Sequence, residues 1–268
     1  MRRLLLAALL AATPASGQEL VLTPAPVQGG LALGRVAPGS VVTLDSRPVP
    51  VAPDGEFLLG FGRDATQATL EIARPGAPAE RRTLEVARRR FDVQRVDGLP
   101  QARVTPDPAA LRRIAEENAE IARARARVTR EGWYRGAWSW PATGPISGVY
   151  GSQRILNGEP RSPHWGVDVA APAGTPVLAP ADGEVSLVQS DNFLTGATVI
   201  VDHGYGLNSV YAHLSAIDVA PGERVRRGQR LGAIGATGRT TGPHLHWGAN
   251  WFEVRLDPAL LVPPMPSN

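Results

Sequence analysis

The sequence has 268 residues, with 28 basic and 25 acidic side chains, and it contains no cysteine. Every basic residue is an arginine, so the charges nearly cancel and the composition gives no reason to expect nucleic-acid binding. The lack of cysteine excludes a disulfide-stabilised scaffold, and the length suits about two domains held together by ordinary hydrophobic cores.

The first 17 residues have the features of a secretory signal peptide. Two arginines precede an apolar run from Leu4 to Ala12, and small residues then follow up to Gly17. The apolar run is too short for a permanent membrane anchor. We therefore expect residues 1–17 to be removed and the mature chain to be exported without an integral membrane segment.

Residues 18–104 are predicted to form a small accessory domain that resembles a β-sandwich. Short apolar runs alternate with turns such as Asp54-Gly55 and Pro75-Gly76, at a spacing typical of short antiparallel strands. No recognisable catalytic or metal-binding motif occurs in this part of the sequence. The run from Arg88 to Arg90 could contact a polyanion, but adjacent charges at the end of a strand are usually just exposed.

One long helix is predicted within a linker of residues 105–132. Asp107 is a suitable N-cap, Pro108 fits the first helical position, and Gly132 ends a stretch rich in Ala, Arg and Glu that runs to about Arg130. The apolar stripe is narrow, so we expect the helix to be a connecting arm that docks on the C-terminal domain. The stripe consists of Leu111, Ile114, Ile121 and Val128.

Residues 133–268 are predicted to form an antiparallel β-sheet domain. Short strands and Gly/Pro turns fill the segment, and helical periodicity is nearly absent. The domain begins with an aromatic cluster from Trp133 to Trp140, which could either bind sugar rings or seal the junction between the domains. We favour the seal, because exposed tryptophan is costly.

Two short segments of this domain carry side chains suited to a metal site. Strand-like alternation places His164 and Asp168 on one face in the first segment, and His244 and His246 on one face in the second. A single histidine is more often a hydrogen-bonded structural residue than a ligand. Two imidazoles and a carboxylate together, however, are what a catalytic zinc ion requires, since it keeps its fourth position for water.

The two remaining histidines are predicted to differ in role. The run from Ser209 to Leu214 alternates, which would place Tyr211 and His213 on the same strand face and makes His213 a further residue of interest. His203 ends a strand at a glycine-rich turn, and we interpret it as structural.

The segment from about Trp140 to Pro258 resembles the M23 family of zinc metallopeptidases, the lysostaphin and LytM-like group. The matching pieces include the motif His164-x-x-x-Asp168, the run Tyr211–Leu214, and the run Gly235–His246 that ends in Pro-His-Leu-His. The resemblance implies a mainly β fold in which residues 133–268 form a barrel-sandwich-like peptidase domain.

By this resemblance the chain is expected to be a periplasmic endopeptidase that cuts peptide cross-links of peptidoglycan with a zinc-activated water. Its partners would be the peptide stems of peptidoglycan and a cell-wall or divisome protein. The resemblance implies one zinc ion per chain with the ligands His164, Asp168 and His246, and two catalytic histidines, His213 and His244.

Two other classes of function remain open. A non-catalytic cell-wall factor could use the same groove to bind peptidoglycan or to regulate a partner amidase. A barrel-sandwich carrier domain could pair the glycine turns of residues 174–185 and 225–235 and carry a phosphorylated histidine, although export and Asp168 count against it. For the N-terminal half, we expect recruitment of the wall or of partners rather than coverage of the groove.

Overall fold

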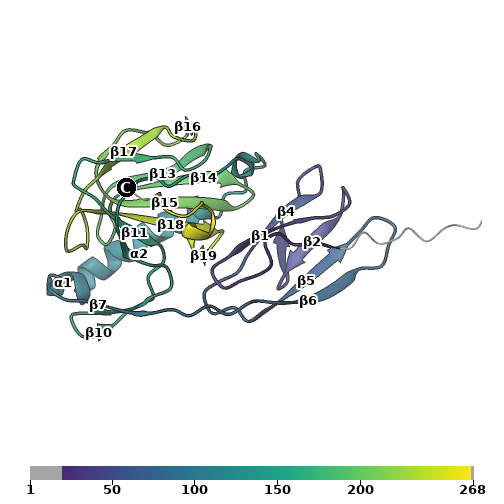
Figure 1. Ribbon diagram of the computed structural model, residues 1–268, viewed down its shortest axis with the longest axis horizontal. Coiled ribbons are helices and arrows are strands. Elements are labelled where there is room, and N and C mark those ends of the chain that lie inside the picture. The colour runs from purple at the N-terminus through teal and green to yellow at the C-terminus, as the bar shows by residue number, and fades with distance from the viewer. Residues whose placement is uncertain (1–19, 267–268) are drawn as a thin grey trace, which may run out of the picture.

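The computed structural model describes residues 20–266, and it is built mainly from β-strands in two groups with a helix alongside the second (Figure 1). The predicted signal peptide lies outside the described residues. The first group is a small sandwich of two antiparallel sheets. One sheet pairs β1 (Leu31–Arg35) with β4 (Glu56–Gly60), and the other has the order β3-β2-β5-β6, with β2 (Val41–Leu44), β3 (Arg47–Val49), β5 (Gln67–Ala73) and β6 (Glu80–Glu85).

Strand β4 is the central element of the sandwich, because all five of its residues are buried. Strand β5, by contrast, alternates, with Leu70 and Ile72 facing the core and the residues between them less buried. The second face of β4 packs against the other group of strands. At Gly60 a side-chain Cβ would lie 2.7 Å from the Cβ of Trp251, so only glycine permits this approach.

The second group is a ten-stranded antiparallel sheet whose main path runs β16-β13-β14-β15-β18-β11-β8. Strand β14 is buried along its whole length, because both faces of the sheet are covered. The main apolar cluster of this sheet lies on one face, around Tyr211 and Trp247. The strands are β8 (Ile146–Gly148), β11 (Val167–Ala170), β12 (Pro176–Leu178), β13 (Gly183–Asn192), β14 (Gly196–Gly204), β15 (Leu207–Ile217), β16 (Arg224–Val225), β17 (Arg230–Ile234), β18 (His244–Trp251) and β19 (Val254–Leu256).

The long helix is α2 (Pro108–Arg125), preceded by a single turn, α1 (Gln101–Val104). As predicted, Asp107 caps α2, since its side chain accepts a hydrogen bond from the backbone N–H of Ala110. The helix ends at Arg125, earlier than the sequence pattern indicated.

The docking face of α2 is narrower than the predicted stripe. Ile121 is buried against Ile200 and Val210 of the sheet, whereas Leu111 is 53% and Val128 51% exposed. The expected contacts of Leu111 and Val128 are therefore wrong, because α2 meets the sheet with its C-terminal half and Val128 follows the end of the helix. The first and middle turns of the helix are held by polar contacts instead. Glu117 accepts a hydrogen bond from the backbone N–H of Phe193, and Arg113 pairs with Asp191.

The two groups of strands share contacts that tie them into one structure. Strand β7 (Val93–Val96) pairs in parallel with β9 (Gln153–Leu156), which also pairs with β10 (Glu159–Pro160). The core of the sandwich continues into Tyr205 and Trp251 of the second group. Trp138 packs against the cores of both groups, as expected for an aromatic cluster that seals a junction.

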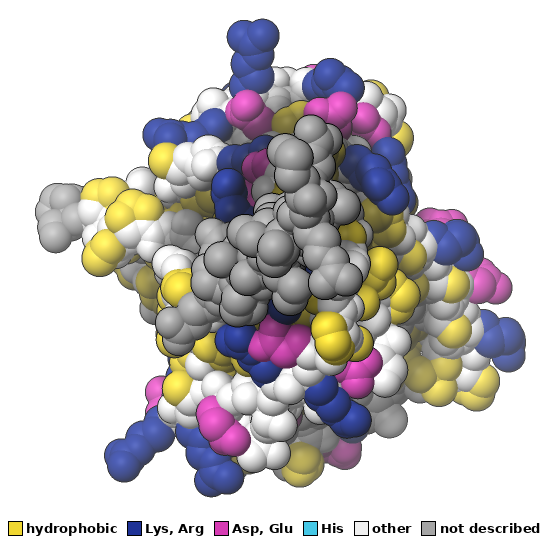
Figure 2. All heavy atoms as spheres, turned by 90° about the vertical axis from the view of Figure 1, so that its right-hand side faces the viewer, with side chains coloured by type: hydrophobic (Ala, Val, Ile, Leu, Met, Phe, Trp, Pro, Cys, Tyr) yellow, Lys and Arg dark blue, Asp and Glu magenta, His cyan; other side chains and the backbone are white. Residues whose placement is uncertain are grey.

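The outer end of the sandwich carries a mixed surface. Figure 2 views this end, and arginine and acidic side chains lie interspersed around it without a large patch of one sign. Within residues 20–266, no helix is long and apolar enough to cross a membrane.

Candidate metal centre and active site

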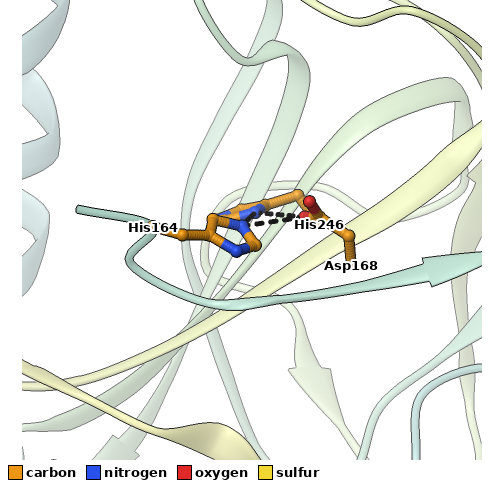
Figure 3. Close-up of side chains that lie close together, drawn as sticks. All are labelled: His164, Asp168 and His246. Carbon is orange, nitrogen blue, oxygen red and sulfur yellow. Dashed lines mark hydrogen bonds and ion pairs between the residues drawn. The ribbon is translucent and has the colours of Figure 1, made fainter. Parts of the chain in front are cut away.

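Asp168 and His246 lie directly opposite each other in the antiparallel pair of β11 and β18. One residue away, Val167 opposes Trp247, and both are buried in the core on the other face. Strand alternation thus uses the apolar residues to anchor the pair and turns the polar residues to the opposite side. His164 comes from the loop just before β11 and points to the same place (Figure 3).

Three side-chain atoms converge there, and we call them the ligand triangle: His164 Nε2, Asp168 Oδ1 and His246 Nδ1. His164 Nε2 is 3.0 Å from each of the other two, and His246 Nδ1 is 2.8 Å from Asp168 Oδ1. Around a tetrahedral zinc ion with bonds of about 2.0–2.1 Å, neighbouring ligand atoms are roughly 3.3 Å apart. The triangle therefore has about the size of one face of a zinc coordination sphere.

The protonation of His164 shows why the triangle suits a cation. His164 Nδ1 lies 3.1 Å from the carbonyl oxygen of Val149, to which it donates, so Nε2 is left with its lone pair. Burial lowers the pKa of His164 to about 4, and the ring is therefore neutral near pH 7. A lone pair then faces the Asp168 carboxylate and a second imidazole, and this set of acceptors fits a metal ion.

Asp168 is held by a second set of contacts. Its Oδ2 accepts a hydrogen bond of 3.0 Å from Arg154 Nη2. Burial opposes ionisation of this carboxyl, but the adjacent imidazoles of His164 and His246 hold its pKa well below the usual range. Gly148 on β8 makes room, since a Cβ there would lie 2.4 Å from Oδ2. The sequence offered no motif for Arg154 beyond the family resemblance.

The backbone of His213 turns its ring toward the ligand triangle. Its φ of +63° is in the left-handed region that non-glycine residues rarely adopt, and its N–H donates to the carbonyl of Thr195. Tyr211 stays in the core on the other face, so the prediction that the two share a face is wrong. Burial, then the nearby His246 and His244, lower the pKa of His213 to about 3.

His213 and His244 stand beside the triangle with ring centroids 4.8 Å apart. Each ring has Nδ1 next to a backbone carbonyl, that of Thr237 at 2.8 Å and that of Gly242 at 2.9 Å. Donation from Nδ1 leaves Nε2 as a proton acceptor in both rings. His244 Nε2 is 3.8 Å from Asp168 Oδ1, so these acceptors border the triangle.

His203 lies apart from this group, as predicted. It is fully buried, with Nδ1 2.6 Å from the carbonyl oxygen of Asp182 and Nε2 2.7 Å from Ser209 Oγ. Its ring also packs against Trp138. Both ring nitrogens have partners within the protein, which confirms a structural role.

Two hollows flank the triangle and extend it into a groove. A cavity of about 390 Å³ lies on the side of α2, and one of about 130 Å³ lies on the side of β7 and Leu99. His213 lines both of them. Part of each wall thus comes from residues 94–125, which the sequence pattern assigned to the accessory domain and the linker. Composition could not reveal this, because the wall residues meet the sheet only after folding.

Comparison with known proteins identifies the family. Residues 162–258 match the model of peptidase family M23, and this range includes all five residues of the triangle and its two neighbouring histidines. The crystal structure of a Pseudomonas aeruginosa protein assigned to peptidase M23 is 33% identical, with a TM-score of 0.69 over 88% of this chain and 95% of that one. The chain belongs to peptidase family M23, and the mainly β fold implied by the resemblance is confirmed.

Curated relatives are similar over part of their length. The cell division protein DipM of Caulobacter vibrioides is 34% identical over 171 residues, which are 60% of this chain and 26% of DipM. The peptidoglycan DD-endopeptidase ShyA of Vibrio cholerae is 46% identical over 86 residues, which are 32% of this chain and 20% of ShyA. The chain thus spans about a quarter or less of these relatives.

Proposed function

We propose that this chain is an exported, periplasmic zinc metalloendopeptidase that hydrolyses peptide cross-links of peptidoglycan. The observation that carries the proposal is the ligand triangle of His164, Asp168 and His246, where three potential metal-ligand atoms lie within 3.0 Å of one another. The name of ShyA as a peptidoglycan DD-endopeptidase supports the choice of substrate. The carrier-domain alternative is set aside, because the chain belongs to a peptidase family.

In this proposal the triangle holds one zinc ion, which would polarise the scissile carbonyl and lower the pKa of a water molecule. Arg154 keeps Asp168 oriented through its second oxygen. In His213 and His244 alike, Nδ1 faces a backbone carbonyl and Nε2 is the nitrogen left for proton transfer, so either ring can accept the proton that water loses on attack. The protonated ring can return this proton to the leaving amine, while the other orients the substrate.

The test uses the full mature chain. Metal analysis should give about one zinc ion per chain, and incubation with purified peptidoglycan should release soluble peptides with new amino termini that mass spectrometry can assign. A chain that binds stoichiometric zinc yet leaves the peptides intact would refute the enzymatic proposal.

A second candidate is supported by DipM, which is named for cell division rather than for a reaction. In that case the groove would bind peptidoglycan or a partner amidase without turnover. The same experiment separates the two, because the non-catalytic factor predicts retained metal and retained binding but no new amino termini. A stimulated partner amidase would favour this candidate.

We further propose that residues 18–104, 105–132 and 133–268 act as accessory domain, linker and peptidase domain. Within the described chain, neither hollow is lined by a residue before Gln94, so the sandwich leaves the groove uncovered. This supports a recruiting role. We expect the full chain to bind intact sacculi even when excess soluble cross-linked peptide fills the groove; loss of binding under that competition would contradict recruitment by the sandwich.

A further inference from the structure

The cavity of about 390 Å³ beside the ligand triangle has an unusual lining. It is enclosed by α2, by the loop before β11 and by β18, and three of the site histidines contribute to it. Among the described residues that line it, there is no aspartate or glutamate. The lining does contain five arginines, namely Arg125, Arg154, Arg161, Arg239 and Arg255.

Two of these arginines have carboxylate partners inside the protein. Arg154 pairs with Asp168, and Arg161 pairs with Glu159 at 3.0 Å. Their charges are therefore at least partly compensated, and each has a structural explanation.

Arg125 and Arg255 differ from them. Arg255 Nη1 donates 3.1 Å to the neutral amide oxygen of Asn250, and the buried Nε of Arg125 has no hydrogen-bond partner. Within residues 20–266, no carboxylate lies within 4.0 Å of either guanidinium. Burial lowers the pKa of both groups, and the charge of Arg255 adds to the decrease at Arg125.

A pair of partly buried like charges without a carboxylate partner is costly, because both desolvation and mutual repulsion oppose it. An anion between the two guanidinium groups would offset both costs. Carboxylates fit guanidinium groups particularly well, because the planar fork of donors can bind two oxygens at once. The unpaired Nε of Arg125 supplies a donor for such a contact.

We propose that Arg125 and Arg255 form a subsite for a free carboxylate of the substrate, next to the scissile bond. The inference rests on the proposed function, since it names the part of the peptide stem that this side of the groove binds. His164, His213 and His246 line the same cavity, so a group bound there lies beside the reacting carbonyl. This subsite also gives a reason for the docking of α2 on the catalytic sheet, because the docked helix places Arg125 in the wall of the cavity.

The test compares substrates before it compares variants. Synthetic cross-linked peptides are prepared with each free carboxylate near the cleaved bond either intact or converted to its amide, and kcat/KM is measured with the wild-type chain. We expect amidation of one particular carboxylate to lower kcat/KM by about 10-fold or more, the usual value of a charge-assisted contact. This arm needs no substitution and therefore cannot be confused by misfolding.

The variant arm uses Arg125→Gln, with Arg123→Gln as the matched control on the exposed side of the same helix. Arg125→Gln should lose about 10-fold on the carboxylate peptide and nothing further on its amide, whereas Arg123→Gln should match the wild type on both. Arg125→Lys should recover part of the loss.

The outcomes separate the two proposals. Wild-type activity that is equal on every carboxylate and amide pair overturns the subsite and leaves the endopeptidase proposal standing. If Arg125→Gln lowers kcat/KM equally on the carboxylate peptide and on its amide, the subsite is likewise overturned, because the effect of the side chain then does not depend on the charge of the substrate. A wild-type chain that cleaves none of the peptides, with zinc bound, overturns the proposed function itself.

Discussion

Two buried polar clusters in this molecule have opposite chemistry. Where the sandwich meets the sheet, the carboxylate of Glu56 accepts hydrogen bonds from the hydroxyl of Tyr134 at 2.6 Å and from Arg135 Nε at 2.8 Å. At the ligand triangle, the carboxylate of Asp168 lies next to two imidazole nitrogens, His164 Nε2 and His246 Nδ1. His164 Nε2 is fixed as an acceptor, because the Nδ1 of the same ring donates to the carbonyl of Val149. Each donor at Glu56 therefore has its acceptor, whereas the triangle brings together three atoms of the kinds that bind metal ions.

The contrast shows how a structural cluster differs from a functional one when both are buried. Glu56 is only 8% exposed at its side chain, about as little as Asp168 at 7%, so burial alone does not distinguish them. What differs is whether the protein supplies the complementary groups. A well-ordered cluster of two imidazole nitrogens and a carboxylate oxygen is a group of atoms that could hold a metal ion from outside the chain. The predictions below test this distinction.

The largest effect is expected from removing a member of the triangle. Asp168→Asn or His246→Ala should reduce bound zinc far below one per chain and lower kcat/KM by about 10³-fold or more, because a three-ligand site reduced to two loses most of its affinity. Metal analysis and peptide cleavage measure both. Asp202→Asn is the control, because Asp202 is also a buried carboxylate but accepts its hydrogen bond from Thr129, away from the triangle. The Asp202→Asn protein should keep its bound zinc. Stoichiometric zinc in Asp168→Asn would contradict the ligand assignment.

Breaking the structural cluster should affect stability and leave the chemistry intact. Glu56→Ala leaves the hydroxyl of Tyr134 and the Nε of Arg135 without their acceptor, and we expect a loss of about 2–3 kcal/mol in the free energy of unfolding. Denaturant titration measures it, with Glu71→Ala as control because its pair with Arg81 is exposed and weak. Zinc content and activity of the folded protein should not change. If the Glu56→Ala protein is folded but binds no zinc, the cluster at Glu56 also affects metal binding, and the distinction between a structural and a functional cluster fails.

The histidines beside the triangle should separate metal binding from turnover. His213→Ala and His244→Ala should retain zinc and lose about 10²-fold in kcat, the usual size of a general acid–base contribution. Single-turnover kinetics on a soluble peptide, with metal analysis of the same sample, provides the measurement. Full activity of His213→Ala would show that its ring takes no part in the reaction despite its position.

Acid should destabilise the zinc-free protein through its buried imidazoles. Burial lowers the pKa of His164 and His203 to about 4, below the unfolded value of about 6.5. Between these values the unfolded chain binds protons that the folded chain does not, so stability falls as the pH drops from about 6.5 to 4. Denaturant titration across this range should show a loss on the order of 2 kcal/mol per buried histidine. His203→Gln should weaken the slope without altering zinc binding; an unchanged slope would contradict this origin.

Much of the site could be predicted from the sequence, because strand alternation is a local rule. It predicted that His164 joins Asp168 and that His244 and His246 share a strand face, and the short motifs were sufficient to indicate the family. His164, however, lies in the loop before β11 rather than on the strand, so alternation is not what brings it to Asp168. The same rule failed at His213, since a single left-handed residue reverses the face and nothing in the residue types reveals it.

Other features depend on contacts that local patterns do not contain. Residues far apart in the sequence come together in the continuous core through Trp251, in the parallel pairing of β7 with β9, and in the cavity that Arg125 and Arg255 both line. Burial of every residue in β4 has the same origin, because its second face is covered by the other group of strands. Composition predicted strands in these regions but could not predict which of them would meet.

The smallest effects are expected along α2, where the predicted stripe and the observed docking face disagree. Ile121→Ala removes a side chain that is 8% exposed and packed on Ile200 and Val210, so we expect a loss of about 2 kcal/mol in unfolding free energy. Leu111→Ala removes one that is 53% exposed, and the change should stay within about 0.5 kcal/mol. Denaturant titration of both variants under the same conditions resolves this difference in unfolding free energy. Equal losses would mean that the whole stripe docks in solution, and α2 would then meet the sheet along its entire length. If the difference is found, apolar contacts anchor only the C-terminal half of α2, and this half is also the one that brings Arg125 into the groove.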